Sequence, residues 1–131
     1  MIKRILGIDP GQRYFGLAIA DLETKISSPY KILDLKEKDF LKKLKDIIKK
    51  EEIKKIVVGK PLNLRGERTK ETLNLEKIMN LFKDEIKIPF IDFDERLTSK
   101  MADKIDLKNK KKDHAVAASI ILQNFLDKFY G

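Results

Sequence analysis

The sequence predicts a mixed α/β fold in which helices pack on a five-stranded sheet. Two observations predict this class. The first third of the chain holds three short apolar or alternating segments in succession, which indicates strands joined by tight turns as an antiparallel meander. The remainder alternates helical and strand-like segments, and such strands pair in parallel through right-handed crossovers. The length of 131 residues fits a single domain over residues 1–131.

The first three strands are predicted from apolar runs and from alternation. Residues 3–9 form a short buried strand, which Pro10 and Gly11 end. Residues 13–21 alternate between two faces, which predicts a half-buried strand. One face carries Phe15, Leu17 and Ile19, and the other carries the small residues Gly16, Ala18 and Ala20. A third short strand is expected around residues 30–33.

Helices separated by two strands are predicted for the rest of the chain. Apolar stripes over residues 40–48 and 75–86 predict amphipathic helices, the second ending before Pro89. Short apolar runs predict strands at the positions 56–58 and 90–93. A short helix at 99–105, a loop at the lysine run 108–112 and a last helix with an apolar stripe over 115–129 complete the expected order.

The composition favours a nucleic-acid partner. The chain has 29 Lys and Arg against 21 Asp and Glu, a net charge of +8, which favours nucleic acid first and an anionic membrane second. The alternative is that a lysine-rich chain reflects genome composition or a hot habitat. There is no cysteine, no apolar stretch long enough to span a membrane and no signal-peptide pattern. We therefore expect a cytoplasmic protein without disulfides or a membrane partner.

An acidic residue ends the first predicted strand, in "GIDPGQRYFGLAIAD". A carboxylate at a buried strand tip is costly without a role, so Asp9 is the first candidate site residue. Neither common nucleotide-binding fingerprint fits. A Rossmann turn opens a helix, whereas a strand follows here, and a Walker loop needs Ser or Thr after Gly-Lys, whereas Pro61 follows Lys60.

Further acidic residues follow the fifth strand and open the last helix. Asp92, Asp94 and Glu95 close the strand in "FIDFDERLTS", and Asp113 with His114 opens the helix in "KKKDHAVAAS". If strands one, four and five are neighbours, their carboxyl ends meet at one edge of the sheet. Oxygen ligands from three places could then hold Mg²⁺ or Mn²⁺ in a two-metal site for phosphodiester hydrolysis.

Each of these residues also has a purely structural interpretation. Asp94 or Glu95 could pair with Arg96 at the strand end. Asp113 could be only the N-cap of the last helix, where Asp is favoured. His114 could be structural or exposed, because a single histidine without partners indicates little.

Four segments in order resemble the YqgF/RuvX family of the RNase H-like superfamily. They are "ILGIDPGQRYFGLAIAD", "IVVGKPLNLRGE", "IDFDERLTS" and "DHAVAASIILQNFL", and they run nearly from end to end of the chain. The resemblance implies an RNase H-like sheet and a cytoplasmic endonuclease that matures the 5′ end of pre-16S rRNA, with structured RNA or ribosomal subunit precursors as partners. Kinship with RuvC implies the alternative, a Holliday junction resolvase acting on four-way DNA.

The resemblance also implies the catalytic residues. It puts them at Asp9, Glu95 and Asp113, with Asp94 and His114 completing the candidate ligands for Mg²⁺ or Mn²⁺. Counting back from "AASIILQ", the family's third aspartate falls on His114, with Asp113 one residue early. One position is about 100° around a helix, so the two side chains point differently. We favour Asp113 as the ligand because a hard cation prefers oxygen.

Glycine and basic residues near these acids are candidate substrate contacts. Gly11 and Gly16 permit a tight turn and a close approach of the backbone beside Asp9. The candidate phosphate contacts are Lys60, Asn63, Arg65, Arg96, Lys110, Lys111 and Lys112. The alternatives are a structural loop around Asn63, a pair of Arg96 with Glu95, and a solvated lysine run.

Two other function classes compete with a nuclease. Proteins of the actin and sugar-kinase type share a strand-Asp-x-Gly-turn-strand pattern, but they bind a nucleotide between two such domains, and this length supplies one. A nucleic-acid-binding module without catalysis is also compatible with the shifted third acid. We expect a monomer or a weak dimer, and a strict monomer would count against a resolvase, which needs two sites related by symmetry.

Overall fold

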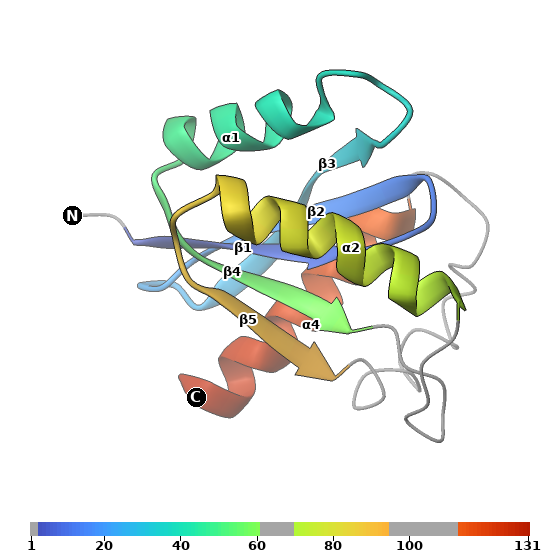
Figure 1. Ribbon diagram of the computed structural model, residues 1–131. Coiled ribbons are helices and arrows are strands. Elements are labelled where there is room, and N and C mark those ends of the chain that lie inside the picture. Colours follow the sequence, from blue (N-terminus) through green and yellow to red (C-terminus); the bar gives the residue numbers. More distant parts are fainter. Residues whose placement is uncertain (1–2, 61–69, 95–112) are drawn as a thin grey trace.

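The computed structural model describes residues 3–60, 70–94 and 113–131, and within them five strands form one sheet with helices on both faces (Figure 1). The strands are β1 (Arg4–Asp9), β2 (Tyr14–Asp21), β3 (Ile26–Asp34), β4 (Ile53–Lys60) and β5 (Phe90–Asp94). The helices are α1 (Phe40–Lys50), α2 (Lys70–Glu85) and α4 (Asp113–Phe129). The expected helix at 99–105 and loop at 108–112 lie outside the described residues.

The strand order is β3-β2-β1-β4-β5. β1 pairs antiparallel with β2, and β2 pairs antiparallel with β3, so the predicted meander is confirmed. β4 is parallel to both β1 and β5, as expected for strands connected by helical crossovers. The carboxyl ends of β1, β4 and β5 therefore lie at the same edge of the sheet, as the sequence analysis required for a shared site (Figure 1).

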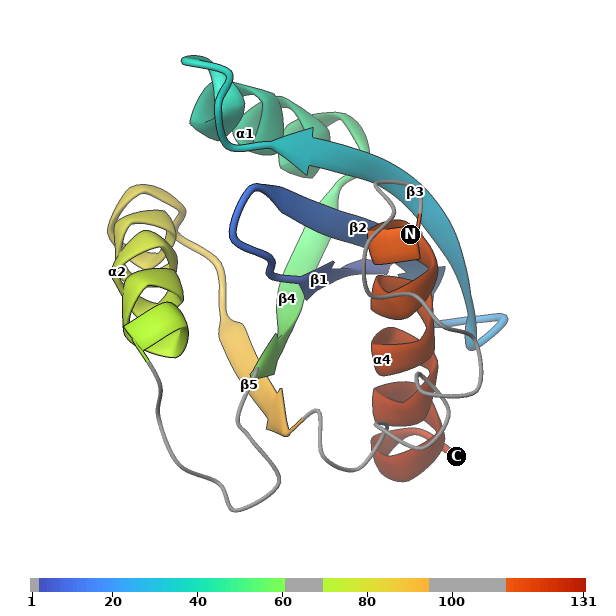
Figure 2. The same ribbon diagram turned by 90° about the vertical axis from the view of Figure 1, so that its right-hand side faces the viewer.

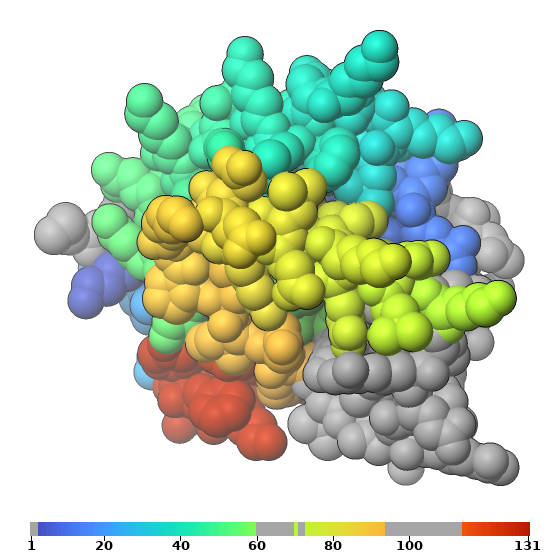
Figure 3. Space-filling model, in the orientation of Figure 1, coloured from blue at the N-terminus to red at the C-terminus, as the bar shows by residue number. Residues whose placement is uncertain are grey.

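One face of the sheet is covered by α1 and α2 and is called here the α1–α2 face. Its core is built from large side chains: Leu6 and Ile8 of β1, Phe15 and Leu17 of β2, Ile56 and Val58 of β4, with Leu44, Ile47, Met79 and Phe82 from the helices. Phe82 meets Phe15 edge-on at 5.7 Å between ring centroids. Figure 3 shows α1 and α2 side by side over this face, where the Lys45 ammonium donates to Glu85 at 3.0 Å.

The opposite face, called the α4 face, is covered by α4 in the part of the chain that the structure describes (Figure 2). It is built from Ile5, Ala18, Ala20, Val57 and Phe93 of the sheet and from Ala118, Ile121, Leu122, Phe125 and Leu126 of α4. Glycines let the helix approach closely. A Cβ at Gly7 would lie 2.9 Å from the Leu122 Cβ, and a Cβ at Gly16 would overlap the carbonyl group of His114. The first turn of α4 therefore rests directly on β2.

The expectation that β2 is half-buried is wrong. Phe15, Gly16, Leu17, Ala18 and Ala20 are all buried, so both faces of the strand are covered. Alternation between large and small apolar residues has the same period as alternation between core and solvent, so the two patterns look alike in the sequence. The small residues instead make room for α4, which packs on them.

The third strand is longer than the expected 30–33. It runs over Ile26–Asp34 at the edge of the sheet, where Pro29 is tolerated because no further strand needs its missing N–H. Its beginning is held by α4: the Ser27 N–H donates to Gln123 Oε1 at 2.9 Å, and the Ser27 hydroxyl donates to the Ser119 carbonyl at 2.6 Å. Local hydrophobicity does not reveal such a strand, because its partners are polar and distant in sequence.

The other predicted elements are observed with small shifts in their ends. The predicted stripe of the last helix is buried except at Phe129, whose side chain is exposed. Among the helices described, none is both long and apolar enough to cross a membrane.

Candidate functional site

The candidate site is centred on Asp9, the last residue of β1. β1 is the middle strand of the sheet, and Asp9 pairs across it with Gly16 of β2. Alternation along β1 places Ile5 in the core of the α4 face and Ile8 in the core of the opposite face. The Asp9 carboxylate lies on the α4 face, where its side chain is 14% exposed.

His114 lies in the first turn of α4, directly against Asp9. Its Nδ1 is 3.3 Å from the Asp9 Oδ2, and its side chain is 23% exposed. When Nδ1 carries the ring proton, it donates to the carboxylate, and the other ring nitrogen, Nε2, is then an acceptor. His114 is therefore half-buried rather than exposed, and the structure brings it together with Asp9.

Two glycines make this contact sterically feasible. Gly16 lets the backbone of His114 rest on β2, as described above. A Cβ at Gly11 would lie 2.5 Å from the Tyr14 carbonyl oxygen and 3.0 Å from the His114 Cε1. A larger residue at either position would push the imidazole away from Asp9. The predicted close approach of backbone beside the acid thus has a defined partner, the first turn of α4.

An aromatic and a basic residue extend the site along β2. The Tyr14 ring lies 6.3 Å from the His114 ring between centroids. The Arg13 guanidinium carbon lies 4.8 Å from the centroid of the Tyr14 ring. A hydrogen bond from Arg13 to Asp34 raises the pKa of Arg13, so this side chain is a cation at every pH of biological interest. A row of contacts therefore leads from Arg13 to Asp9.

The donor pair at Asp9 fits a divalent cation. Carboxylate oxygen and imidazole nitrogen are both ligands of such ions. Two donors at adjacent positions of a six-coordinate ion, each about 2.1 Å from it, lie about 3.0 Å apart. The observed separation between Asp9 Oδ2 and His114 Nδ1 is 3.3 Å, close to that span. A mixed oxygen and nitrogen pair suits Mn²⁺ at least as well as Mg²⁺.

Of the acids at the end of β5, Asp92 does not join the site. Its carboxylate is 49% exposed and lies 3.8 Å from the ammonium of Lys83 on α2, which places it on the α1–α2 face. The neighbouring Phe93 packs on the α4 face, as strand alternation requires. Asp94 pairs with Lys60 in the register of β5 and β4, so their backbones lie at the same sheet edge as Asp9.

The remaining predicted residues are not tested by the structure. Asp113 is the first residue of α4, next to His114, but its side chain, like those of Lys60 and Asp94, lies outside the described part. Wholly outside it are Asn63, Arg65, Glu95, Arg96, Lys110, Lys111 and Lys112. Among residues 3–60, 70–94 and 113–131, no group of three or more histidine or acidic side chains is arranged to hold a metal. Within that range the site consists of the Asp9–His114 pair.

Tyr14 and Arg13 are not among the site residues predicted from the sequence. Both lie between Gly11 and the residue paired with Asp9, so the hairpin that positions the acid also positions them. This proximity was a usable signal, because a tight turn after Asp9 returns the chain past the same carboxylate.

Comparison with known proteins places the chain among nuclease-like proteins. A family model described as "RuvX: Holliday junction resolvase" matches residues 3–128, which confirms the resemblance drawn from the four sequence segments. A protein of Dictyoglomus thermophilum named "Putative pre-16S rRNA nuclease" is 39% identical, over 95% of each chain. A protein of the same name from a Sulfurihydrogenibium species is 38% identical, over 97% of this chain and 92% of its own.

Solved structures share the fold at much lower identity. RuvC of T. thermophilus, in complex with a Holliday junction substrate, matches with a TM-score of 0.61 at 13% identity over 95% of each chain. Fowlpox virus resolvase, in complex with Holliday junction DNA, matches with a TM-score of 0.63 at 12% identity over 100% of both chains. The predicted RNase H-like fold is therefore confirmed.

Proposed function

The chain belongs to the RuvX (Holliday junction resolvase) family, and from that membership we propose that it is a metal-dependent endonuclease that hydrolyses phosphodiester bonds. The observation that carries the proposal is the contact between Asp9 and His114 at the carboxyl edge of the sheet. A carboxylate at the tip of a central strand, half enclosed by a helix and beside an imidazole, has no need to be there for packing. It is suited to hold a cation against a phosphate backbone.

The proposed ligands of the cation are Asp9 and His114, completed by carboxylates from Asp94, Glu95 and Asp113. A bound divalent ion supplies Lewis-acid activation of the phosphodiester and stabilises the charge that develops on its oxygens. We propose two ions, Mg²⁺ or Mn²⁺, which these acidic residues would hold and which would supply the Lewis-acid chemistry for phosphodiester hydrolysis. His114 orients the Asp9 carboxylate through Nδ1 where it does not itself bind an ion.

We propose structured RNA, in particular precursor 16S rRNA cut at its 5′ end, as the substrate. The names of the relatives from Dictyoglomus and Sulfurihydrogenibium support this choice. Four-way DNA is the second candidate, supported by the family description and by the Holliday junction complexes of the structural relatives. A net charge of +8 suits either polyanion.

The proposed phosphate contacts are the basic and polar residues that the sequence places near the acids. They are Lys60, Asn63, Arg65, Arg96, Lys110, Lys111 and Lys112, with Gly11 leaving space for the backbone. Contacts of this kind fix the register of a strand without reading its sequence. The proposed protein acts in the cytoplasm, where precursor ribosomal subunits are its partners.

A cleavage assay with two substrates tests the proposal. Purified protein is incubated with end-labelled precursor 16S rRNA and, separately, with a labelled four-way DNA junction, each with Mg²⁺, Mn²⁺ or EDTA. Asp9→Asn is run in parallel, with Asp92→Asn as the matched control, because Asp92 is an acid of the opposite face. We expect metal-dependent cutting that Asp9→Asn abolishes and Asp92→Asn leaves unchanged.

The preferred substrate decides between rRNA maturation and junction resolution. Cutting that survives Asp9→Asn would contradict the proposed site. Binding of both substrates without cutting under any metal would favour a nucleic-acid-binding module. In that case His114→Asp, which restores the family's expected aspartate, separates a disabled ligand set from a missing partner: cutting appears in the first case only.

A further inference from the structure

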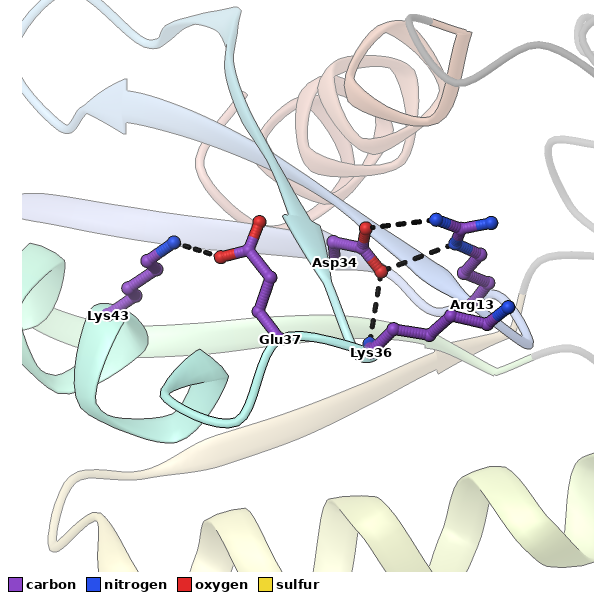
Figure 4. Close-up of polar contacts among 5 residues, drawn as sticks. All are labelled: Arg13, Asp34, Lys36, Glu37 and Lys43. Atoms are coloured by element: carbon purple, nitrogen blue, oxygen red, sulfur yellow. Dashed lines mark hydrogen bonds and ion pairs between the residues drawn. The ribbon is translucent and has the colours of Figure 1, made fainter.

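Arg13 is an exposed arginine whose guanidinium is nevertheless held from two sides. Its Nε and one terminal nitrogen face the two carboxylate oxygens of Asp34, each at 3.4 Å, and its carbon lies 4.8 Å from the Tyr14 ring centroid. Figure 4 shows the other terminal nitrogen pointing away from Asp34. The side chain of Arg13 is 48% exposed. The guanidinium is thus oriented, with one edge used by Asp34 and another edge accessible.

The fold does not depend on the Arg13–Asp34 pair. The backbones of these strands are already joined where the Leu35 N–H donates to the Arg13 carbonyl at 2.8 Å. Asp34 has its own local task, since its carboxylate accepts the Lys36 N–H at 3.0 Å and shapes the turn after β3 (Figure 4). A solvent-exposed ion pair with donor–acceptor distances of 3.4 Å contributes little to stability. The geometry therefore calls for another explanation.

The position of Arg13 relative to the candidate site supplies that explanation. Tyr14 separates Arg13 from His114, and His114 contacts Asp9. A nucleic-acid strand with one phosphate at Asp9 would carry its neighbouring phosphates past this row of side chains. A planar guanidinium binds a phosphate through two parallel hydrogen bonds, which a lysine cannot reproduce.

We propose that Arg13 binds a backbone phosphate of the substrate strand beside the Asp9–His114 pair, with Tyr14 and Asp34 as positioning residues that fix its guanidinium. The inference rests on the proposed nuclease function and adds a substrate contact to it. Asp34 orients the cation but also partly neutralises it. Removing the charge of Asp34 while keeping its shape should therefore strengthen binding, and only through Arg13.

The test is a double-mutant cycle on nucleic-acid affinity. The dissociation constant of a fluorescein-labelled single-stranded RNA, and of DNA with the same sequence, is measured in EDTA for wild type, Arg13→Ala, Asp34→Asn and the double variant. Asparagine keeps an oxygen that can accept the Lys36 N–H, so the turn after β3 is preserved. The matched control is Glu37→Gln, which removes an equal charge next to Lys43 on α1 (Figure 4).

We expect Arg13→Ala to weaken RNA binding about tenfold, because it removes a charge-assisted contact to a phosphate. The slope of log affinity against log salt should become shallower by about 0.7, the change for one contact to a single strand. Asp34→Asn should tighten binding about threefold, and this gain should vanish in the double variant. Arg13→Lys should recover the salt slope but only part of the affinity.

Three outcomes would overturn the inference. The first is unchanged affinity in Arg13→Ala. The second is equal tightening in Glu37→Gln and Asp34→Asn, which would mean that only net charge matters. The third is a gain from Asp34→Asn that persists without Arg13. Circular dichroism and thermal melting of each variant establish that it is folded, so a loss of affinity is not a loss of structure.

The result is separable from the proposed nuclease function. If wild type cuts RNA in an Asp9-dependent way but Arg13→Ala binds and cuts normally, only the role of Arg13 is wrong. If wild type binds neither RNA nor DNA, both the nuclease proposal and this inference fail. In steady state, Arg13→Ala should raise KM with a much smaller change in kcat, whereas Asp9→Asn should abolish kcat.

Discussion

The two faces of the sheet are built on different principles. The α1–α2 face fills its volume with large side chains such as Phe15, Leu17 and Phe82 beneath two helices. The α4 face has small sheet residues instead, with Gly7, Gly16 and Ala18 beneath α4. Asp9, the only acid placed at the tip of β1, opens onto the second face. The close approach of the α4 backbone to the sheet, which these small residues permit, brings the His114 side chain to Asp9.

Substitutions on the two faces should therefore have different effects. Substitutions that remove side-chain volume from the α1–α2 face should lower stability without changing the site. Substitutions that add side-chain volume to the α4 face should displace His114 from Asp9. Neighbouring residues of β2 belong to opposite faces, so they offer a direct comparison at nearly the same place in the sequence.

The largest effect is expected from Phe15→Ala. Phe15 is fully buried on the α1–α2 face, and its removal leaves a cavity against Phe82, so we expect a loss of about 3–5 kcal/mol in the free energy of unfolding. Urea denaturation measures the loss. At low temperature, the fraction that stays folded should retain wild-type affinity for RNA. Impaired RNA binding by folded Phe15→Ala protein would contradict the expectation that changes on the α1–α2 face leave the site intact.

Gly16→Ala should have a smaller effect on stability than Phe15→Ala but a larger effect on nuclease activity. The added Cβ would overlap the carbonyl group of His114, and relieving that overlap should cost about 1–3 kcal/mol. Because the relief moves the first turn of α4, nuclease activity should fall at least tenfold even where the protein remains folded. Leu17→Ala, a change on the other face, is the control in the same denaturation and cleavage measurements. Normal activity in folded Gly16→Ala would show that α4 need not be close.

Ser27→Ala tests the link between β3 and α4 at the edge of the α4 face. It removes the hydroxyl that donates to the Ser119 carbonyl at 2.6 Å and fixes β3 to α4. We expect a loss of about 1 kcal/mol in the free energy of unfolding. Ser28→Ala is the matched control, since Ser28 is exposed and adjacent. Equal losses from both substitutions would argue against a specific link between β3 and α4.

The smallest effect is expected from Tyr30→Phe, at the edge of the sheet near the end of α1. The Tyr30 hydroxyl donates to Glu51 Oε2 at 2.9 Å, and we expect a loss of about 0.5 kcal/mol, because the contact is exposed. Burial first, and then this hydrogen bond, raise the pKa of Tyr30 above its usual 10.0. The folded state therefore holds the phenolic proton more tightly than the unfolded state does.

The contribution of Tyr30 should be complete below pH 10 and disappear as the pH rises through the raised pKa. Thermal melting of wild type and Tyr30→Phe from pH 8 to pH 11 measures it. The two melting temperatures should converge at the alkaline end. A difference that grows with pH would contradict the direction of the shift.

Most of the fold followed from local patterns in the sequence. Apolar runs and helical stripes located the strands and helices, and the alternation of the second half predicted parallel pairing at one sheet edge. Two features did not follow. The beginning of β3 depends on polar contacts with Gln123 and Ser119, far along the chain. The burial of both faces of β2 depends on where α4 packs, which the small residues indicate only in retrospect.

The position of some candidate site residues in the fold could be predicted from the sequence. Asp9 was identified because an acid at a buried strand tip has a desolvation cost, and the structure places it as expected. The role of His114 is harder to predict from the sequence, because it depends on a contact with Asp9, which lies 105 positions away. Asp92 belongs to the predicted group of acids at the end of β5, but its carboxylate lies on the α1–α2 face, close to Lys83.

Isothermal titration calorimetry of Mn²⁺ binding tests whether Asp9 and His114 hold a cation. Wild type is compared with Asp9→Asn, His114→Ala and the opposite-face control Asp92→Asn. If Asp9 and His114 hold the cation, the first two variants should bind Mn²⁺ at least tenfold more weakly, about 1.4 kcal/mol, while Asp92→Asn matches wild type. Equal affinity in wild type and Asp9→Asn would contradict a metal site at the tip of β1.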